Sequence, residues 1–191
     1  MARGFHCLTV QEVRRETRDA VAVTLAVPED LRDTFRFTPG QYLTVRAEIG
    51  GERLRRTYSI CAGPGEPLRL AVQKLPGGRF SGFVNERLAP GDVLEVMPPM
   101  GRFGIPPDPA AARAHLAIAA GSGITPVLAI VKAILADEPQ SRFVLLYGNK
   151  TSDSIIFKRE LDDLEDRHLD RLLVVHVLSR EGLELELLNG R

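Results

Sequence analysis

The feature that most restricts the fold is an alternation of apolar runs and helical patterns in the second half of the chain. The apolar runs, which have the length of buried strands, lie at 115–120, 142–148 and 171–180. A helix is expected between each run and the next, and the second of these helices is expected to run through 155–167 with Asp153 or Ser154 as its N-cap. Because parallel strands need such crossovers, the alternation predicts half of a doubly wound parallel sheet.

The first half of the chain has a different texture. From residue 5 to about 105, short segments alternate apolar and polar residues between Gly and Pro. The expected strands lie at 19–27, 40–49, 53–60, 67–75 and 92–99. Gly50 and Gly51 predict a hairpin, and a helix is expected at 79–88. Many short strands at regular spacing predict a small antiparallel barrel.

The change of texture predicts two domains, so the expected fold class is a β barrel plus an α/β unit. The segment 105–114, rich in Pro and Ala, is expected to link them. We place the barrel domain at 1–108 and the α/β domain at 109–191. A three-stranded sheet is a poor place for such a domain to end, so the second domain is expected to be incomplete at the C-terminus.

Composition argues against several classes of function. Lysine plus arginine and aspartate plus glutamate number 25 each, which gives no electrostatic case for a nucleic-acid or membrane partner. Cys7 and Cys61 alone cannot hold an iron–sulfur cluster, since such clusters usually need four thiolates. The four histidines lack a ligand pattern, so no metal site is expected. The N-terminus lacks the apolar core of a signal peptide, so a cytoplasmic protein is expected.

The segment RRTYSI, residues 55–60, carries charge and aromaticity that a plain barrel strand does not need. On a strand, Arg56 and Tyr58 share one face. A planar guanidinium can clamp phosphate oxygens in pairs, while a nearby aromatic ring lies on a flat ligand. The alternative is an exposed arginine beside a tyrosine on the barrel surface.

Two glycine-rich turns each precede a helix. Gly77 and Gly78 allow a phosphate to approach the backbone at the start of 79–88, with Ser81 in its first turn. The alternative there is an ordinary turn with Ser81 as the helix cap. GSGITP, residues 121–126, joins a strand to a helix and fits a dinucleotide pyrophosphate. The alternative is a tight strand-to-helix turn without a ligand.

Ser179 and Arg180 follow the third strand of the second half, where the ribose of a nucleotide would lie. A hydroxyl and a guanidinium at that position favour a 2′-phosphate, and hence NADPH over NADH. A solvated strand end explains the same two residues equally well.

Taken in order, the segments RRTYSI, GGRFSGF, GSGITP, YGNKT and LSRE resemble the ferredoxin–NADP reductase family over essentially the whole chain. The resemblance implies an FAD-binding barrel and an NADP-binding α/β domain. It implies that Arg56 holds the FAD pyrophosphate, Tyr58 stacks on the isoalloxazine, and Ser59 donates a hydrogen bond near flavin N5. The further FAD contacts that it implies are Val72 and Lys74 through their backbone, and Gly78 and Ser81 at the phosphates.

For the second domain, the resemblance implies contacts to NADPH from Gly121, Gly123, Ile124 and Thr125. Thr125 would lie near the nicotinamide, so Ser59, Tyr58 and Thr125 are the expected catalytic residues. Ser179 and Arg180 would bind the 2′-phosphate.

The implied activity is hydride transfer from NADPH to FAD, after which electrons pass to a [2Fe–2S] domain and an oxygenase component of a multicomponent complex. That cluster lies in the family's C-terminal domain, and its four cysteines are absent from this chain. The Cys-Gly segment that the family places beside the nicotinamide is absent too. Three alternatives remain: a flavin-binding electron-transfer subunit without its own NADPH chemistry, a flavin reductase, and a ligand-free structural module.

Overall fold

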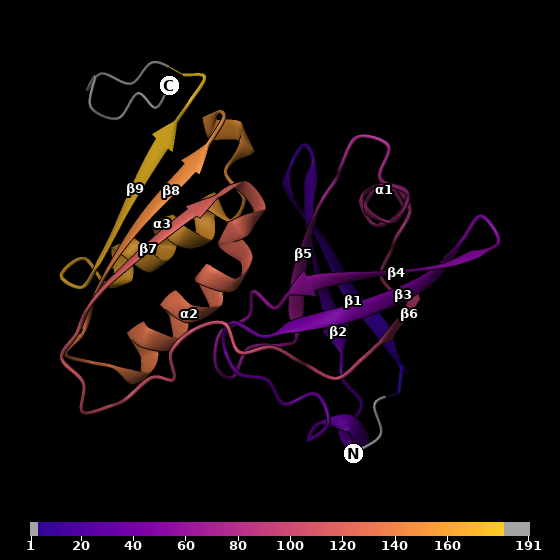
Figure 1. The fold of residues 1–191 in the computed structure, drawn as a ribbon, viewed down its shortest axis with the longest axis horizontal. Helices are drawn as coiled ribbons and strands as arrows, with labels where there is room; N and C mark the ends of the chain where they lie inside the picture. Colours follow the sequence, from indigo (N-terminus) through magenta and orange to yellow (C-terminus); the bar gives the residue numbers. More distant parts are fainter. Residues whose placement is uncertain (1–3, 182–191) are drawn as a thin grey trace.

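A computed structural model describes residues 4–181 as two units that lie side by side (Figure 1). The first unit is built on an antiparallel sheet in the order β4-β3-β6-β1-β2-β5. Its strands are β1 (His6–Thr17), β2 (Ala20–Ala26), β3 (Tyr42–Ile49), β4 (Glu52–Ser59), β5 (Arg69–Gln73) and β6 (Val93–Val96). A bridge between Ile60 and Leu70 joins the ends of β4 and β5, so the sheet closes as the expected barrel.

Two short helices interrupt the barrel strands: a 3₁₀ turn at Glu29–Leu31 and α1 at Arg79–Glu86. The β3–β4 hairpin closes through Gly50 and Gly51, whose φ angles are 60° and 77°. Both values lie in the left-handed region, as a tight hairpin of this kind requires, so the glycines confirm the predicted turn.

The longest barrel strand, β1, was not expected from the sequence. Only Leu8 and Val10 of this strand are buried, and most of its other side chains are at least partly exposed. The pairing with β2 slips between Val10 and Glu12 and again between Arg15 and Thr17. These irregularities break the alternation of apolar and polar residues that would reveal a strand in the sequence.

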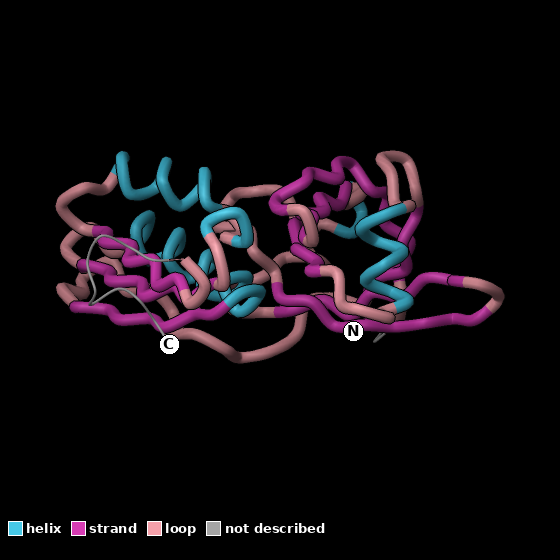
Figure 2. The backbone as a smooth tube through the Cα atoms, turned by 90° about the horizontal axis from the view of Figure 1, so that it is seen from above, coloured by secondary structure: helices cyan, strands magenta, loops and turns pink. Residues whose placement is uncertain are grey.

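The second unit is the predicted α/β sheet, with parallel strands in the order β7-β8-β9 within the described residues. Its elements are β7 (Ala114–Ala120), a 3₁₀ turn η2 (Gly121–Gly123), α2 (Ile124–Asp137), β8 (Arg142–Asn149), a 3₁₀ turn η3 (Ser152–Ser154), α3 (Lys158–Arg167) and β9 (Leu172–Leu178). Both helices cover the same face of the sheet (Figure 2). Leu116, Ile118 and Leu173 on β7 and β9 are 52–76% exposed.

The prediction for the start of α3 was wrong. The helix begins at Lys158, because Phe157 adopts a left-handed conformation with φ 64° and interrupts any helix that would run on from Ile155. Thr151, rather than Asp153 or Ser154, caps the preceding 3₁₀ turn. The apolar segment from Ile155 to Phe157 is fully buried, so packing overrides the helical pattern there.

The two units share a continuous apolar contact. Ala20, Ala22, Cys61 and Ala71, all from the barrel, are buried in the same cluster as the core of the α/β unit. The barrel has its own core, built around inward-facing residues of its strands. Small side chains at the contact allow the two backbones to approach closely.

A buried carboxylate ties the connection between the units to the sheet. Glu138, which follows α2, is fully buried and accepts hydrogen bonds from Ser141 Oγ (2.6 Å) and His115 Nε2 (2.9 Å). It also accepts from the Asp108 backbone N–H (3.0 Å) and the Arg113 guanidinium (3.2 Å). Burial by itself would raise the pKa of this carboxyl, but the hydrogen bonds from Ser141 and His115 outweigh it and lower the pKa to about 2.

Among residues 4–181, no helix has both the length and the apolar character needed to cross a bilayer. The same residues hold no cluster of three or more His, Cys, Asp or Glu suited to a metal ion. The domain boundary at 108/109 stays a prediction, and residues 182–191, where the second domain is expected to break off, lie outside the described residues.

Candidate functional site

A cavity of about 350 Å³ lies where the barrel meets the loop between β7 and α2. Three groups of residues line it: Thr57, Tyr58 and Ser59 at the end of β4, Ala71, Gln73 and Leu75 on and after β5, and Ser122, Gly123, Thr125 and Pro126 at the start of α2. The cavity, which we call the interdomain crevice, therefore combines strand ends from one unit with a helix N-terminus from the other.

Tyr58 forms part of the barrel wall of the crevice. Its ring is partly buried and packs against Phe80 of α1, with ring centroids 6.0 Å apart. Burial raises the pKa of the phenol to about 12, against the opposing effect of the Arg56 charge, so the hydroxyl is neutral at physiological pH. Ser59 lies beside Tyr58 in the same wall, although neighbouring strand residues point to opposite faces, because the crevice opens at the end of the strand.

Arg56 lies beside the crevice rather than in its lining. Its side chain is exposed, and one guanidinium N–H donates to the Arg55 carbonyl at 2.7 Å. Among residues 4–181 it forms no ion pair with a carboxylate. The remaining guanidinium donors are therefore available to an anion next to Tyr58.

The N-terminus of α1 is close to Tyr58 because Phe80 belongs to its first turn. The cap residue Gly78 has no side chain, and therefore gives the first N–H groups of the helix no side-chain acceptor. A Cβ at Gly78 would fall 2.4 Å from Ser81 Oγ, so a larger residue would have to displace this hydroxyl. Ser81 Oγ accepts from the Leu75 N–H (3.1 Å) and donates to the Gly78 carbonyl (3.2 Å), which makes it the closure of the turn.

The side chains of Val72 and Lys74 do not line the crevice. Val72 is fully buried in the barrel core, and Lys74 pairs with Glu86 at 2.7 Å. Ala71 and Gln73 line the crevice instead. The side chains of Ala71 and Gln73 therefore point to one face of the strand, and those of Val72 and Lys74 to the other. The backbone contacts predicted for Val72 and Lys74 stay predictions. The side chains of Ala71 and Gln73 were not among the predicted site residues. Because apolar residues alternate along this strand, the sequence could have shown which of its two faces points away from the barrel core.

The loop from β7 into α2 is held by internal hydrogen bonds. Gly121 has φ 49°, and its carbonyl accepts from Tyr147 Oη at 3.0 Å. Thr125 is largely buried, and its hydroxyl donates to the Ser122 carbonyl at 2.9 Å. Gly123 gives α2 no side-chain cap and lines the crevice. The Ile124 N–H donates to the Gly121 and Ser122 carbonyls, and Pro126 has no N–H, so these two first-turn positions offer no donor to a ligand.

Ile124 is fully buried, so any contact from this residue to a ligand would come from its backbone. Ser179 and Arg180 extend the sheet ladder past the end of β9. The Ser179 N–H donates to the Asn149 carbonyl (3.0 Å), and the Arg180 N–H donates to the Lys150 carbonyl (2.9 Å). Both side chains are exposed at the carboxyl edge of the sheet, the edge that also carries Gly121, but they do not line the crevice. Ser179 and Arg180 could therefore contact only a different part of a bound nucleotide from the part that Thr125 could contact.

These features fit two nucleotide cofactors that meet in the crevice. The barrel offers an aromatic ring, a guanidinium and an uncapped helix N-terminus, the donor set that a flavin ring and its diphosphate require. The α/β unit offers a glycine turn between a parallel strand and a helix, the position at which a dinucleotide pyrophosphate binds in sheets of this kind. A Cβ at Gly121 would lie 3.8 Å from Gln73 Oε1, so the two units approach closely at this point.

Comparisons with known proteins agree with this geometry. The model of the oxidoreductase FAD-binding domain matches residues 7–105, and that of the oxidoreductase NAD-binding domain matches residues 117–191. The chain is 50% identical to the E subunit of 1,2-phenylacetyl-CoA epoxidase from Escherichia coli K12, over 98% of this chain and 53% of that protein. It is 38% identical to the ferredoxin reductase component of 3-ketosteroid-9-alpha-monooxygenase from Rhodococcus rhodochrous, over 92% of this chain and 50% of that protein.

Among solved structures, phthalate dioxygenase reductase matches with a TM-score of 0.74 and 28% identity, over 91% of this chain and 52% of that one. That protein is described as a modular structure for electron transfer from pyridine nucleotides to [2Fe-2S]. The chain spans about half the length of the curated relatives it matches. On the matches to both domain models and the shared fold, the chain belongs to the ferredoxin–NADP reductase family, with an FAD-binding barrel and an NAD-binding α/β domain.

Proposed function

We propose that this chain takes electrons from NADPH into FAD and passes them to an iron–sulfur centre and on to an oxygenase, phenylacetyl-CoA epoxidase. The observation that carries the proposal is the interdomain crevice, which sets Tyr58 and Ser59 of the barrel opposite Gly123 and Thr125. The choice of oxygenase rests on the 50% identity to the E subunit of the Escherichia coli epoxidase. A cytoplasmic location is part of the same proposal.

Each residue contributes positioning rather than covalent chemistry. When bound, FAD would supply the chemistry that links a two-electron hydride donor to a one-electron acceptor. Arg56 and the N–H groups at the start of α1 would bind the diphosphate of the flavin nucleotide, with Gly78 and Ser81 shaping that turn. Tyr58 would hold the flavin ring by stacking, and the Ser59 hydroxyl would donate toward its edge.

On the other wall, the glycine loop that precedes α2 would bind the second dinucleotide. The glycine loop, from Gly121 to Gly123, lets the backbone approach the pyrophosphate. Thr125, fixed by its hydrogen bond to the Ser122 carbonyl, would orient the nicotinamide and help to exclude water from the crevice.

The proposal is tested by the visible spectrum of the purified chain before and after anaerobic addition of NADPH. We expect bound oxidised flavin that NADPH bleaches. Protein that is folded but colourless, and that takes up no FAD offered in excess, would contradict the flavin site. Bound flavin that NADPH leaves oxidised would instead favour an electron-transfer subunit without its own NADPH chemistry, and release of free reduced flavin would favour a flavin reductase.

Nucleotide preference gives a second test, at the carboxyl edge of the sheet. Arg180→Ala should lower the ratio of kcat/KM for NADPH to that for NADH at least tenfold, because a charged hydrogen bond to a phosphate contributes about 1.5–3 kcal/mol. Stopped-flow reduction of the flavin by each nucleotide measures the ratio. Arg36→Ala, which removes an 83% exposed arginine from the barrel, is the matched control. An unchanged preference in the Arg180 variant would remove this residue from the 2′-phosphate site.

A further inference from the structure

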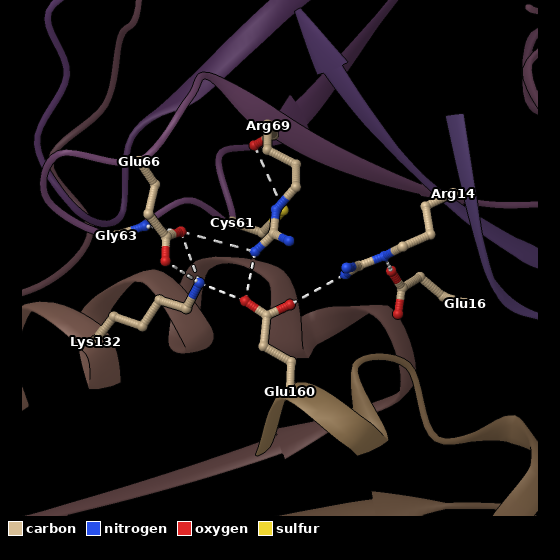
Figure 3. A network of polar contacts seen from close by, with 8 residues as sticks. All are labelled: Arg14, Glu16, Cys61, Gly63, Glu66, Arg69, Lys132 and Glu160. Atoms are coloured by element: carbon tan, nitrogen blue, oxygen red, sulfur yellow. Dashed lines mark hydrogen bonds and ion pairs between the residues drawn. The ribbon is translucent and has the colours of Figure 1, made fainter. Parts of the chain in front are cut away.

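Six charged side chains meet where the barrel faces α2 and α3 (Figure 3), and none of them lines the crevice. The barrel supplies Arg14, Glu16, Glu66 and Arg69, and the α/β unit supplies Lys132 and Glu160. We call this set the interdomain charge cluster. It holds three positive and three negative groups, and its ion pairs from Arg14 and Arg69 to Glu160 and from Lys132 to Glu66 cross between the units.

Glu160, on α3, is the acceptor that joins the most elements. Its Oε1 accepts from Arg69 Nη2 of β5 at 2.5 Å and from Lys132 Nζ of α2. Its Oε2 accepts from Arg14 Nη2 of β1 at 3.3 Å. The side chain is 18% exposed, and although burial opposes ionisation, hydrogen bonds from Arg69 and Lys132 lower the pKa of the carboxyl below its ordinary value. One carboxylate thus holds two barrel strands and a neighbouring helix at fixed distances.

Lys132 makes a contact that crosses between the units. Its ammonium donates to both oxygens of Glu66, at 2.7 and 2.6 Å, and Glu66 in turn accepts from the Gly63 N–H at 2.9 Å. A Cβ at Gly63 would lie 2.9 Å from Lys132 Cβ and Cδ. Since real Cβ atoms do not approach other atoms so closely, the barrel loop and α2 leave no room for one more methyl group.

The cluster and the crevice share their elements. Strand β5 begins at Arg69 in the cluster and ends at Gln73 in the crevice, and α2 begins at the crevice and carries Lys132 two turns later. The end of β4 continues from Ser59 to Cys61, whose N–H donates to the Arg69 carbonyl at 2.9 Å. A rotation of one unit against the other about the cluster would therefore change the width of the crevice.

The apolar contact between the units does not by itself fix such a rotation. It involves small side chains, including Ala20, Ala22 and Ala71, and apolar burial has no preferred direction. Ion pairs that are largely buried gain little net stability, but they are directional, and removing one partner leaves an unpaired charge. In the cluster, the buried contacts of this kind are those of Arg69 and Lys132 with Glu160, whereas Arg14, which also contacts Glu160, is 48% exposed.

We propose that Glu160 is a positioning residue that sets the angle between the two units, and through it the separation of the two cofactor rings in the crevice. The consequence for the rate rests on the proposed function, whereas the angle itself does not. Hydride transfer tolerates little error in distance, and a displacement of about 1 Å can cost on the order of 100-fold in rate.

The test compares Glu160→Gln with Asp166→Asn in the full 191-residue chain. Both variants remove one carboxylate charge from α3, but Asp166 is exposed and lies outside the cluster. Spin labels on exposed Cys7 and on a thiol introduced by Leu169→Cys report the separation of the units. Leu169 is 76% exposed, and Cys61 is fully buried with its thiol pKa raised to about 12 by that burial, so it escapes labelling.

We expect Glu160→Gln to broaden the distance distribution and to slow the limiting rate of flavin reduction at saturating NADPH at least tenfold, with FAD occupancy unchanged. Glu160→Asp should recover part of both effects, and Asp166→Asn should behave as the unsubstituted chain. Gly63→Ala leaves every charge in place, but its added methyl group pushes the barrel loop away from α2. This variant should therefore also broaden the distance distribution.

A distribution that stays narrow in Glu160→Gln would overturn the proposal, and so would a broad one without loss of rate. If NADPH fails to reduce the flavin of the unsubstituted chain, the proposed function is wrong, and the distance distributions alone then decide whether Glu160 sets the angle.

Discussion

Replacing Arg56 by alanine should weaken the binding of FAD by about 10- to 100-fold, so that the chain is purified with little of its yellow colour. The guanidinium lies next to Tyr58 with donors left over from its single bond to the Arg55 carbonyl. A charged hydrogen bond to phosphate contributes about 1.5–3 kcal/mol, and each 1.4 kcal/mol is a factor of about ten in the dissociation constant. Fluorescence titration of the stripped protein with FAD measures the change.

The adjacent residue provides the control for this experiment. Arg55→Ala removes the same charge from the same exposed strand, but from the opposite face of β4. We expect the affinity of this variant to stay within about threefold of the original, because only a long-range charge effect is lost. Equal losses in the two variants would mean that general positive charge, and not a contact from Arg56, attracts the cofactor.

Glu138→Gln should lower the free energy of unfolding by about 3 kcal/mol at pH 7. The carboxylate is fully buried and accepts from Ser141, His115, Arg113 and the Asp108 backbone, and an amide offers one acceptor oxygen in place of two. Urea unfolding followed by circular dichroism measures the loss. Asp137→Asn, one residue away and exposed, removes the same charge and should change the free energy of unfolding by less than about 0.5 kcal/mol.

The pKa of the Glu138 carboxyl also predicts how the free energy of unfolding depends on pH in acid. Its pKa is about 2 in the folded chain against 4.5 for the free group, so its contribution is complete above pH 4.5 and lost as the pH falls toward 2. The unsubstituted chain should therefore lose stability over this interval more steeply than Glu138→Gln, and the two curves should converge near pH 2. Parallel curves would show that the charge of Glu138 contributes nothing to folding.

Much of the architecture followed from the sequence because hydrophobic periodicity and turn residues report local structure directly. The parallel strands of the α/β unit are continuous apolar runs, and the Gly50-Gly51 hairpin is marked by its own residues. Strand β1 escaped prediction because two register slips and a largely exposed surface remove its alternation. The start of α3 was misplaced because the left-handed Phe157 is imposed by tertiary packing, which periodicity does not report.

The candidate site was predictable only in part. The glycine turns and the TYS segment are local signals, and the structure brings Tyr58, Ser59, Gly123 and Thr125 to one crevice. Gln73 was missed because its role depends on which face of β5 meets the other unit. The ion pair between Arg69 and Glu160 joins residues 91 positions apart, and no local pattern in either segment indicates the partner.

The division of the interdomain charge cluster between the units has a consequence for how reductases of this kind can be recombined. Each ion pair between the two units has one member in the barrel and the other in α2 or α3. A chimera that joins this barrel to the nucleotide-binding domain of a relative keeps only the barrel member of each of these ion pairs. An exchange that preserves these contacts must therefore carry both members of each pair: Arg14 and Arg69 with Glu160, and Glu66 with Lys132.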